Sequence, residues 1–318
     1  MKSYIPDISK QIYKEEVLSV LQNKYSSIGP MWVSNQMEWF NSIYATFKDH
    51  DKFLIVIYLI KKTLDFYSRN FVRLSYEEFY SKDILAIEQY SMMEISNLLN
   101  IPKESVRRKL QELEEIGVIN KSKNIITIDR SKFYFSQPVD SIKRIGRFLS
   151  VLSELLKNEN ILQKKITSEK LEIIIKNNFS YIWKLYYELQ IPMMINYKKI
   201  FKDLETFHIF VTCIVNQHLF TRKISGDNVK RDIFIEKMSS AKMNQGINAM
   251  SISDITGIPR ATVIRKLKIL VKQKHLSINE KKHYKLTGKF IKKLNPLQND
   301  VLDKLADFSV KTYNLEIL

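Results

Sequence analysis

The stretch ISNLLNIPKESVRRKLQEL occupies residues 95–113, and the similar stretch ISDITGIPRATVIRKLKIL occupies residues 252–270, 157 residues further along the chain. In the first stretch, apolar residues stand at the spacing of a short helix with one buried face: Ile95, Leu98 and Leu99. A proline is tolerated in the first turn of a helix but not inside one, so Pro102 marks a tight turn followed by a new helix. Each stretch therefore predicts two short helices joined by a turn.

A β-hairpin is predicted after the second helix of each pair. In the first copy Gly117 ends the helix, and residues 118–128 have the pattern of a strand, a polar tip and a second strand. Residues 275–286 repeat this plan in the second copy. A hairpin in this place is a wing, so we expect winged helix-turn-helix modules at about 75–133 and 232–290.

The similarity between the two copies extends upstream of these modules. Residues 47–55 match residues 201–209 at an offset of 154, which differs from 157 by a three-residue insertion. Collinear matches at nearly constant offset indicate an internal duplication with repeats at 1–157 and 158–318. The predicted fold is mainly α, with two small β wings and a helical pseudo-dimer region. Each repeat is expected to end in a closing helix, at 141–156 and 301–315.

The charge of the chain indicates a polyanionic partner. Lys and Arg number 51 against 34 Asp and Glu, so the net charge is +17 and the isoelectric point is about 9.6. A basic field attracts nucleic acid or an anionic surface, although lysine can also serve as general surface polarity. Residues 1–160 carry a net charge of +3 and residues 161–318 carry +14. Binding through phosphate neutralisation should therefore depend mainly on the second copy.

Other features argue against membrane, metal and catalytic roles. The single cysteine, Cys213, lies in an apolar run and is expected to be buried, which fits a cytoplasmic protein. The longest apolar run, residues 53–60, is far too short to span a bilayer. The five histidines lack metal-site spacing, and no glycine-rich phosphate loop or nucleophile motif is present. We therefore expect no cofactor, no metal and no enzymatic activity.

The paired stretches resemble the winged helix-turn-helix modules of bacterial transcription regulators of the Crp and MarR types. The resemblance is carried by the pattern Ile-Ser-x-[Leu/Ile]-x-x-Ile-Pro-x-x-[Ser/Thr]-Val-x-Arg-Lys-Leu-x-x-Leu, which both copies contain. In those families the second helix enters the major groove and the wing reaches the neighbouring backbone or minor groove. The remaining helical regions match no family in this way.

The resemblance implies which residues meet DNA. In the first copy they are Lys103, Ser105, Arg107, Arg108, Lys109, Lys121 and Lys123, with Glu104 beside them. In the second copy they are Arg260, Thr262, Ile264, Arg265, Lys266, Lys268, Lys281 and Lys282, with Ala261 beside them. Arginine can bond guanine, methyl groups can meet thymine, and the lysines suit phosphates. Any one of these cations alone could equally be a solvated surface residue, but Arg108 and Arg265 recur at the same place.

The expected function is that of a sequence-specific transcriptional regulator that binds double-stranded DNA as an intramolecular pseudo-dimer. One alternative is a replication initiator of plasmid or phage type. Another is a winged-helix interaction subunit of a chromosome-organising complex. For the nearly charge-balanced first copy, three roles remain open: it adds specificity, binds weakly, or contacts protein. A small-molecule effector, the target sequence and the oligomeric state stay unassigned, and no membrane partner is expected.

Overall fold

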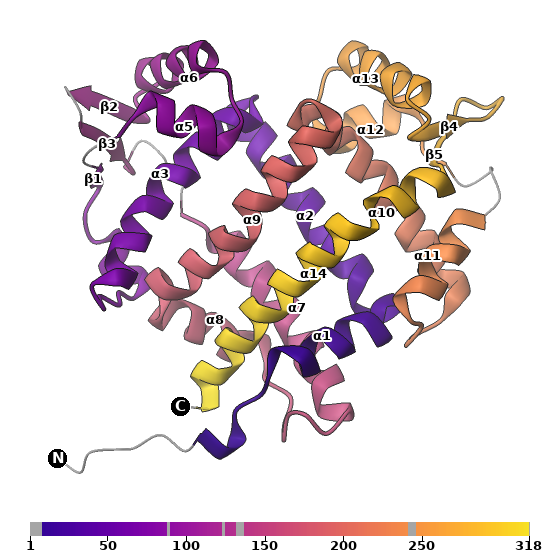
Figure 1. Ribbon diagram of the computed structural model, residues 1–318, viewed down its shortest axis with the longest axis horizontal. Coiled ribbons are helices and arrows are strands. Elements are labelled where there is room, and N and C mark those ends of the chain that lie inside the picture. The colour runs from indigo at the N-terminus through magenta and orange to yellow at the C-terminus, as the bar shows by residue number, and fades with distance from the viewer. Residues whose placement is uncertain (1–7, 88–89, 123–124, 132–136, 241–245, 318) are drawn as a thin grey trace. The chain divides into compact units, whose positions relative to one another are not determined.

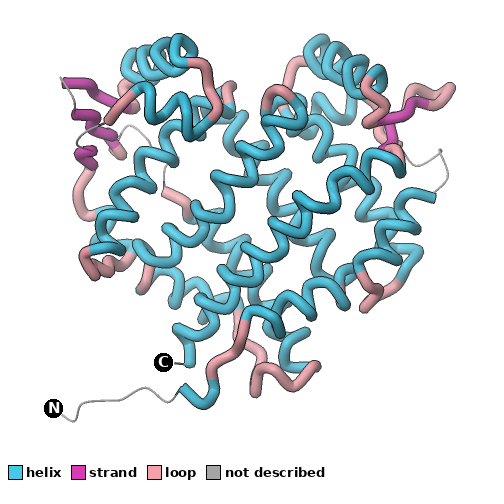
Figure 2. The backbone as a smooth tube through the Cα atoms, in the orientation of Figure 1, coloured by secondary structure: helices cyan, strands magenta, loops and turns pink. Residues whose placement is uncertain are grey.

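Helices dominate the chain. The computed structural model describes residues 8–87, 90–122, 125–131, 137–240 and 246–317. Within these residues it contains fourteen α-helices, one short 3-10 helix, η1 (Ile8–Lys10), and two small antiparallel sheets. Figure 1 labels most of these elements, and Figure 2 colours helices and strands separately. The prediction of a mainly α fold with small β elements is confirmed.

The chain forms two compact units, each built from separate segments. Unit 1 comprises Met1–Glu38, Ile142–Ile175 and Ile209–Leu318. Unit 2 comprises Trp39–Ser141 and Lys176–His208. Residues 1–157 and residues 158–318, the predicted repeats, each contribute segments to both units.

Unit 2 combines a helix pair and its sheet with a long helix from the second half of the chain. Its elements are the end of α2 (Tyr25–Phe47), α3 (His50–Arg69), α4 (Tyr76–Tyr80), β1 (Ile84–Ile87), α5 (Met92–Leu99), α6 (Lys103–Glu115), β2 (Ile119–Ser122), β3 (Ile125–Asp129) and α9 (Phe179–Phe201). The strands are antiparallel in the order β1-β3-β2. Strand β1 was not predicted. Helix α3 packs along α9, and α4 contacts the start of α9.

Unit 1 combines the other helix pair and its hairpin with helices from the start of the chain. Its elements are α1 (Lys14–Asn23), the first part of α2, most of α7 (Val139–Asn158), α8 (Ser168–Asn177) and α10 (Leu204–Ser225), then α11 (Arg231–Ser240), α12 (Ala249–Thr256), α13 (Arg260–Lys272), β4 (Leu276–Ile278), β5 (Tyr284–Leu286) and α14 (Gly288–Ile317). Helix α1 packs along α14 (Figure 1). There the Asn314 side chain bonds both the backbone N–H and the carbonyl of Ile12, at 3.0 and 3.1 Å.

A pair of reciprocal hydrogen bonds holds the corresponding joint in each unit. In unit 2 the N–H of Ser180 donates to the carbonyl of Leu74 at 3.0 Å, and Leu74 N–H donates to Ser180 Oγ at 2.8 Å. In unit 1 Ser26 and Val229 make the same two bonds, at 3.1 and 2.8 Å. Each joint ties a long helix to the segment that precedes a short helix, and in both cases the partners come from opposite halves of the chain.

Unit 2 contains two buried imidazoles in direct contact. His50 Nε2 lies 3.3 Å from His208 Nδ1, and His208 Nε2 lies 2.7 Å from Asn41 Oδ1. Because the amide oxygen of Asn41 accepts, His208 donates from Nε2 and accepts at Nδ1 from His50. Burial lowers the pKa of His50 to about 3, and burial together with His50 lowers the pKa of His208 well below its ordinary value. Both rings are therefore neutral at pH 7.

The long helices α2 and α9 bury a series of aromatic side chains, which are Trp32, Trp39, Phe40, Tyr44, Phe47, Trp183, Tyr186, Tyr187 and Phe201. Helix α7 contains the predicted closing helix 141–156. Helix α14 begins at residue 288 instead of 301, immediately after the hairpin, and continues through Pro296.

Candidate nucleic-acid interface

The two helix pairs form corresponding sites. The first module consists of α5, α6, β2 and β3, and the second module consists of α12, α13, β4 and β5. In α5, Ser96 Oγ donates to the backbone carbonyl five residues on at 2.6 Å, and Ser253 Oγ in α12 does the same at 2.7 Å. The first helix ends in a left-handed residue in both cases, Asn100 at φ 52° and Gly257 at φ 69°. Glycine adopts this conformation freely and asparagine tolerates it, so the turn has the same form in both modules.

The second helix of each module is 13 residues long and buries the same stripe of positions. In α6 the stripe is Val106, Lys109, Leu110 and Leu113, and in α13 it is Val263, Lys266, Leu267 and Leu270. The spacing i, i+3, i+4, i+7 turns this stripe toward the protein and leaves the opposite face for a partner. One lysine lies within each buried stripe, where the sequence predicted a phosphate contact.

The buried lysine of α6 belongs to an internal ion network. Lys109 is 7% exposed and forms a close ion pair with Asp49, and its Nζ lies 4.0 Å from Asp51 Oδ2. Asp51 also accepts a hydrogen bond from Lys198 Nζ of α9 at 2.8 Å. The network therefore fixes α6 to the start of α3 and to α9. Lys266 of α13 is also 7% exposed. We leave both lysines out of the interface, because a phosphate needs an exposed ammonium group.

The outer face of α13 is basic and free of carboxylates. Arg260, Ala261, Arg265 and Lys268 are exposed, while Thr262 and Ile264 are half-buried. Over the residues that the structure describes, no carboxylate lies within ion-pair distance of either arginine or of Lys268. These guanidinium and ammonium groups are consequently available to a phosphate or a base edge.

The outer face of α6 has a different electrostatic character. Arg107 Nε donates to Glu104 Oε2 at 2.9 Å, and Arg108 Nε lies 3.6 Å from Glu112 Oε1. The side chains of both arginines are at least 60% exposed, so each pair contributes little to stability. The pairs matter for binding, because the two glutamates place negative charge beside the guanidinium groups and so weaken the attraction of both arginines for a polyanion. Lys103 is exposed and Ser105 is half-buried on the same helix.

The two hairpins also differ. In the first module Lys121 Nζ lies 2.8 Å from Glu114 Oε2, and its backbone N–H donates to Glu114 Oε1 at 3.0 Å. This contact lowers the pKa of Glu114. In the second module Asn279 closes the hairpin tip, with its side chain accepting from His283 N–H at 2.9 Å. Lys281 and Lys282 are exposed at this tip, and over the described residues neither has an ion-pair partner. Lys123, predicted in the first hairpin, lies outside the described residues.

Sequence reasoning identified these cations but missed which of them are already paired. The signal was present in the spacing, because Glu104 and Glu112 stand three and four residues from Arg107 and Arg108. At the positions of α13 that correspond to the two glutamates, the chain has Ala261 and Ile269 instead. A comparison of the two helices position by position would have predicted that α13 holds the unpaired cations.

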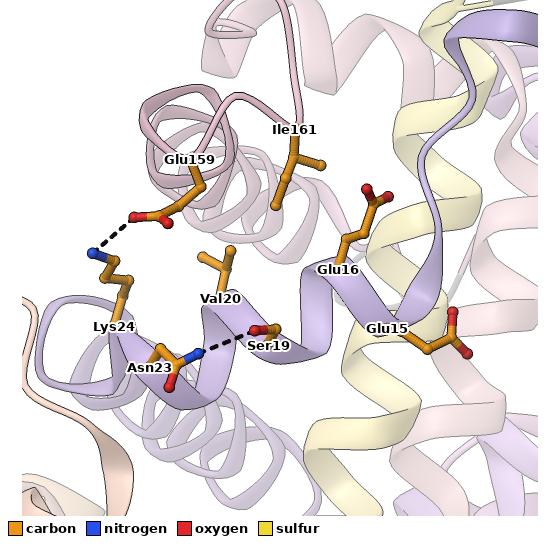
Figure 3. Close-up of a pocket in the computed structure, with 8 residues that line it drawn as sticks. All are labelled: Glu15, Glu16, Ser19, Val20, Asn23, Lys24, Glu159 and Ile161. Carbon is orange, nitrogen blue, oxygen red and sulfur yellow. Dashed lines mark hydrogen bonds and ion pairs between the residues drawn. The ribbon is translucent and has the colours of Figure 1, made fainter.

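Apart from these faces, unit 1 has an open pocket of about 420 Å³ (Figure 3). It is lined by Glu15, Glu16, Ser19, Val20, Asn23, Lys24, Glu159 and Ile161. Lys24 Nζ forms an ion pair with Glu159 Oε1 at 2.8 Å, and Asn23 donates to Ser19, as the dashed lines show. The three glutamates outnumber the single lysine, so this pocket repels nucleic acid and is not part of the interface.

Comparisons with protein-family models, with curated proteins and with solved structures found no match to this chain. Within the part of the chain that the structure describes, no helix combines the length and the apolar composition that crossing a membrane requires.

Proposed function

We propose that this protein binds double-stranded DNA sequence-specifically and regulates transcription, and that its second module is the principal DNA-binding module. The observation that carries the proposal is the outer face of α13. Arg260, Arg265 and Lys268 are exposed there without ion-pair partners among the described residues. A helix that is buried on one face and has unpaired cations on the other suits the major groove, where arginine reads guanine and lysine meets phosphate.

The order of elements supports the proposal that both modules are winged helix-turn-helix domains. In the first module, β1 precedes α5 and pairs with β3, and β3 pairs with β2 in the hairpin after α6. In the second, Ile247 precedes α12 and forms an antiparallel bridge with Tyr284 of β5, and β5 pairs with β4 after α13. An extended segment, two helices and a hairpin that pairs back with that segment thus occur twice, although the segment is a strand in the first module and a single bridge in the second. In this arrangement the second helix and the hairpin tip would contact DNA.

The lengths and offsets of the helices support an internal duplication. Helices α1 and α8 have 10 residues each, and α2 and α9 have 23 each, with starts 154 residues apart. Helices α5 and α12 have 8 residues each, and α6 and α13 have 13 each, with starts 157 residues apart. Because each half contributes to both units, we infer that the chain is an intramolecular pseudo-dimer.

The ion pairs of α6 favour a different role for the first module. Glu104 and Glu112 each lie beside the Nε of one arginine, Arg107 and Arg108 respectively, and so place negative charge where a polyanion would approach. A face of mixed, mutually paired charge suits a weak DNA contact or a protein partner better than a phosphate backbone. This observation is the one that favours the alternative of a winged-helix interaction protein, in which the modules bind protein.

Fluorescence anisotropy with a random-sequence duplex at about 50 and 200 mM salt tests the proposal. We expect binding that weakens steeply with salt. Lys281→Ala should lower the salt slope by about 0.9 for one lost phosphate contact, while Lys121→Ala should leave it unchanged because Lys121 is paired with Glu114. With a selected specific site, Arg265→Ala should weaken binding and relax base preference more than the matched variant Arg108→Ala. Absence of any salt-dependent binding would refute the proposal and leave the interaction role.

A further inference from the structure

One stripe of the outer face of α13 combines Arg265 with methyl groups. Ala261, Ile264, Arg265 and Lys268 stand at i, i+3, i+4 and i+7, so they form one continuous patch on the helix surface. Ala261, Arg265 and Lys268 are exposed and Ile264 is half-buried. The buried stripe lies on the opposite side of the helix, so the methyl group of Ala261 is exposed to solvent and the side chain of Ile264 is partly exposed.

The corresponding patch of α6 contains no such methyl groups. Glu104 stands where α13 has Ala261, and Arg107 stands where it has Ile264. These two residues are the partners of the 2.9 Å ion pair on α6. The two modules therefore present different chemistry at the same two positions: a salt bridge in the first, and two aliphatic groups beside a free arginine in the second.

Base edges in the major groove offer one apolar group, which is the 5-methyl group of thymine. The N-terminal half of a recognition helix lies against the base edges, whereas its later turns are nearer to phosphates. In α13 this places Ala261, Ile264 and Arg265 at the bases and leaves Lys268 for the backbone. Arg265, which has no carboxylate partner among the described residues, can donate two hydrogen bonds to O6 and N7 of guanine.

We propose that the second module reads a guanine through Arg265 and the 5-methyl group of an adjacent thymine through Ala261 and Ile264. The inference rests on the proposed function, since it assigns base preferences to the same DNA-binding site. The preferred ligand of the second module is then duplex DNA that contains a thymine beside a guanine. The first module, with Glu104 and Arg107 at these positions, does not share the preference.

Nucleotide analogues test the inference on the full-length protein. A specific site is first selected from a random duplex pool, and each thymine is then replaced in turn by deoxyuridine, which lacks only the methyl group. Burial of one methyl group corresponds to about a fourfold change in affinity, so we expect about fourfold weaker binding at the contacted thymine. Replacement of the adjacent guanine by 7-deazaguanine, which lacks N7, should weaken binding by about tenfold.

A pair of protein variants assigns the effect to α13. Ile264→Ala should bring the thymine-to-deoxyuridine affinity ratio close to one, whereas the matched variant Arg107→Ala should leave that ratio as in the wild type. The deoxyuridine and 7-deazaguanine experiments use the wild-type protein, so they test the inference even if the Ile264→Ala variant fails to fold. Equal affinity for thymine and deoxyuridine at every position, with salt-dependent duplex binding retained, would overturn this inference alone. Loss of salt-dependent duplex binding altogether would overturn the proposed function with it.

Discussion

The buried imidazoles of unit 2 predict that the protein loses stability in mild acid. The pKa of His50 is 6.5 for an exposed ring and about 3 in the fold, so below pH 6.5 the unfolded chain binds a proton that the folded chain excludes. Stability is then full above pH 6.5 and declines as the pH falls toward 3. The decline is about 1.4 kcal/mol per pH unit for one such group, or about 2 kcal/mol between pH 7 and pH 5. His208 acts in the same direction. The loss is large against a typical stability of about 5–15 kcal/mol.

The double variant His50→Leu/His208→Leu separates this effect from general acid sensitivity. Leucine is the residue at the matching position of the other half, Leu204 for His50 and Leu54 for His208, and both leucines are buried. Urea unfolding at pH 7 and pH 5, followed by tryptophan fluorescence, gives the loss of unfolding free energy for each protein. The wild type should lose more than the variant by about 2 kcal/mol or more. If both proteins lose the same amount, the imidazoles are not the cause and the assignment of neutral buried rings is wrong.

Three other perturbations have expected outcomes. Lys109→Met should lower the unfolding free energy by about 1–3 kcal/mol, because it leaves Asp49 without its cation and Asp51 with Lys198 alone, yet it should not change the salt slope of DNA binding. Ser26→Ala and Ser180→Ala should each cost about 1 kcal/mol in urea unfolding, since each removes the same bond at its joint; a neutral Ser180→Ala would contradict this. The halves 1–157 and 158–318, produced separately, should fold when mixed, as circular dichroism and size-exclusion chromatography would show; independent folding of either half would contradict the exchange of segments.

Local features of the fold were predictable from sequence because their causes are local. Pro102 and the apolar spacing before it place the turn between α5 and α6, and the polar tip after Gly117 places the hairpin. Strand β1 was missed because Ile84–Ile87 is four residues long and carries no turn signal of its own. The assembly of each unit from both halves was also missed, because pairing between distant helices leaves no local pattern in the sequence.

The candidate site was predictable in position but not in charge state. Residue type alone does not reveal that Arg107 is paired and Arg265 is free, since the difference lies in the neighbours three and four residues away. The burial of Lys109 and Lys266 follows from their place in the i, i+3, i+4, i+7 stripe, where a lysine needs an internal partner. A cation within an apolar stripe indicates an internal ion pair more strongly than a surface contact.

Because each unit takes segments from both halves, the two units can fold only in a certain order while the chain is being synthesised on the ribosome. Unit 2 needs no residue beyond His208, whereas unit 1 joins α1 to α14 and so needs both ends of the described chain. At about 5–20 residues per second, residues 209–318 emerge over roughly 5–20 seconds after the last residue of unit 2 is made. The first module can thus mature while the second is still incomplete. Because the unpaired cations of α13 belong to the later unit, a prematurely terminated chain would lack the basic face that we assign to DNA.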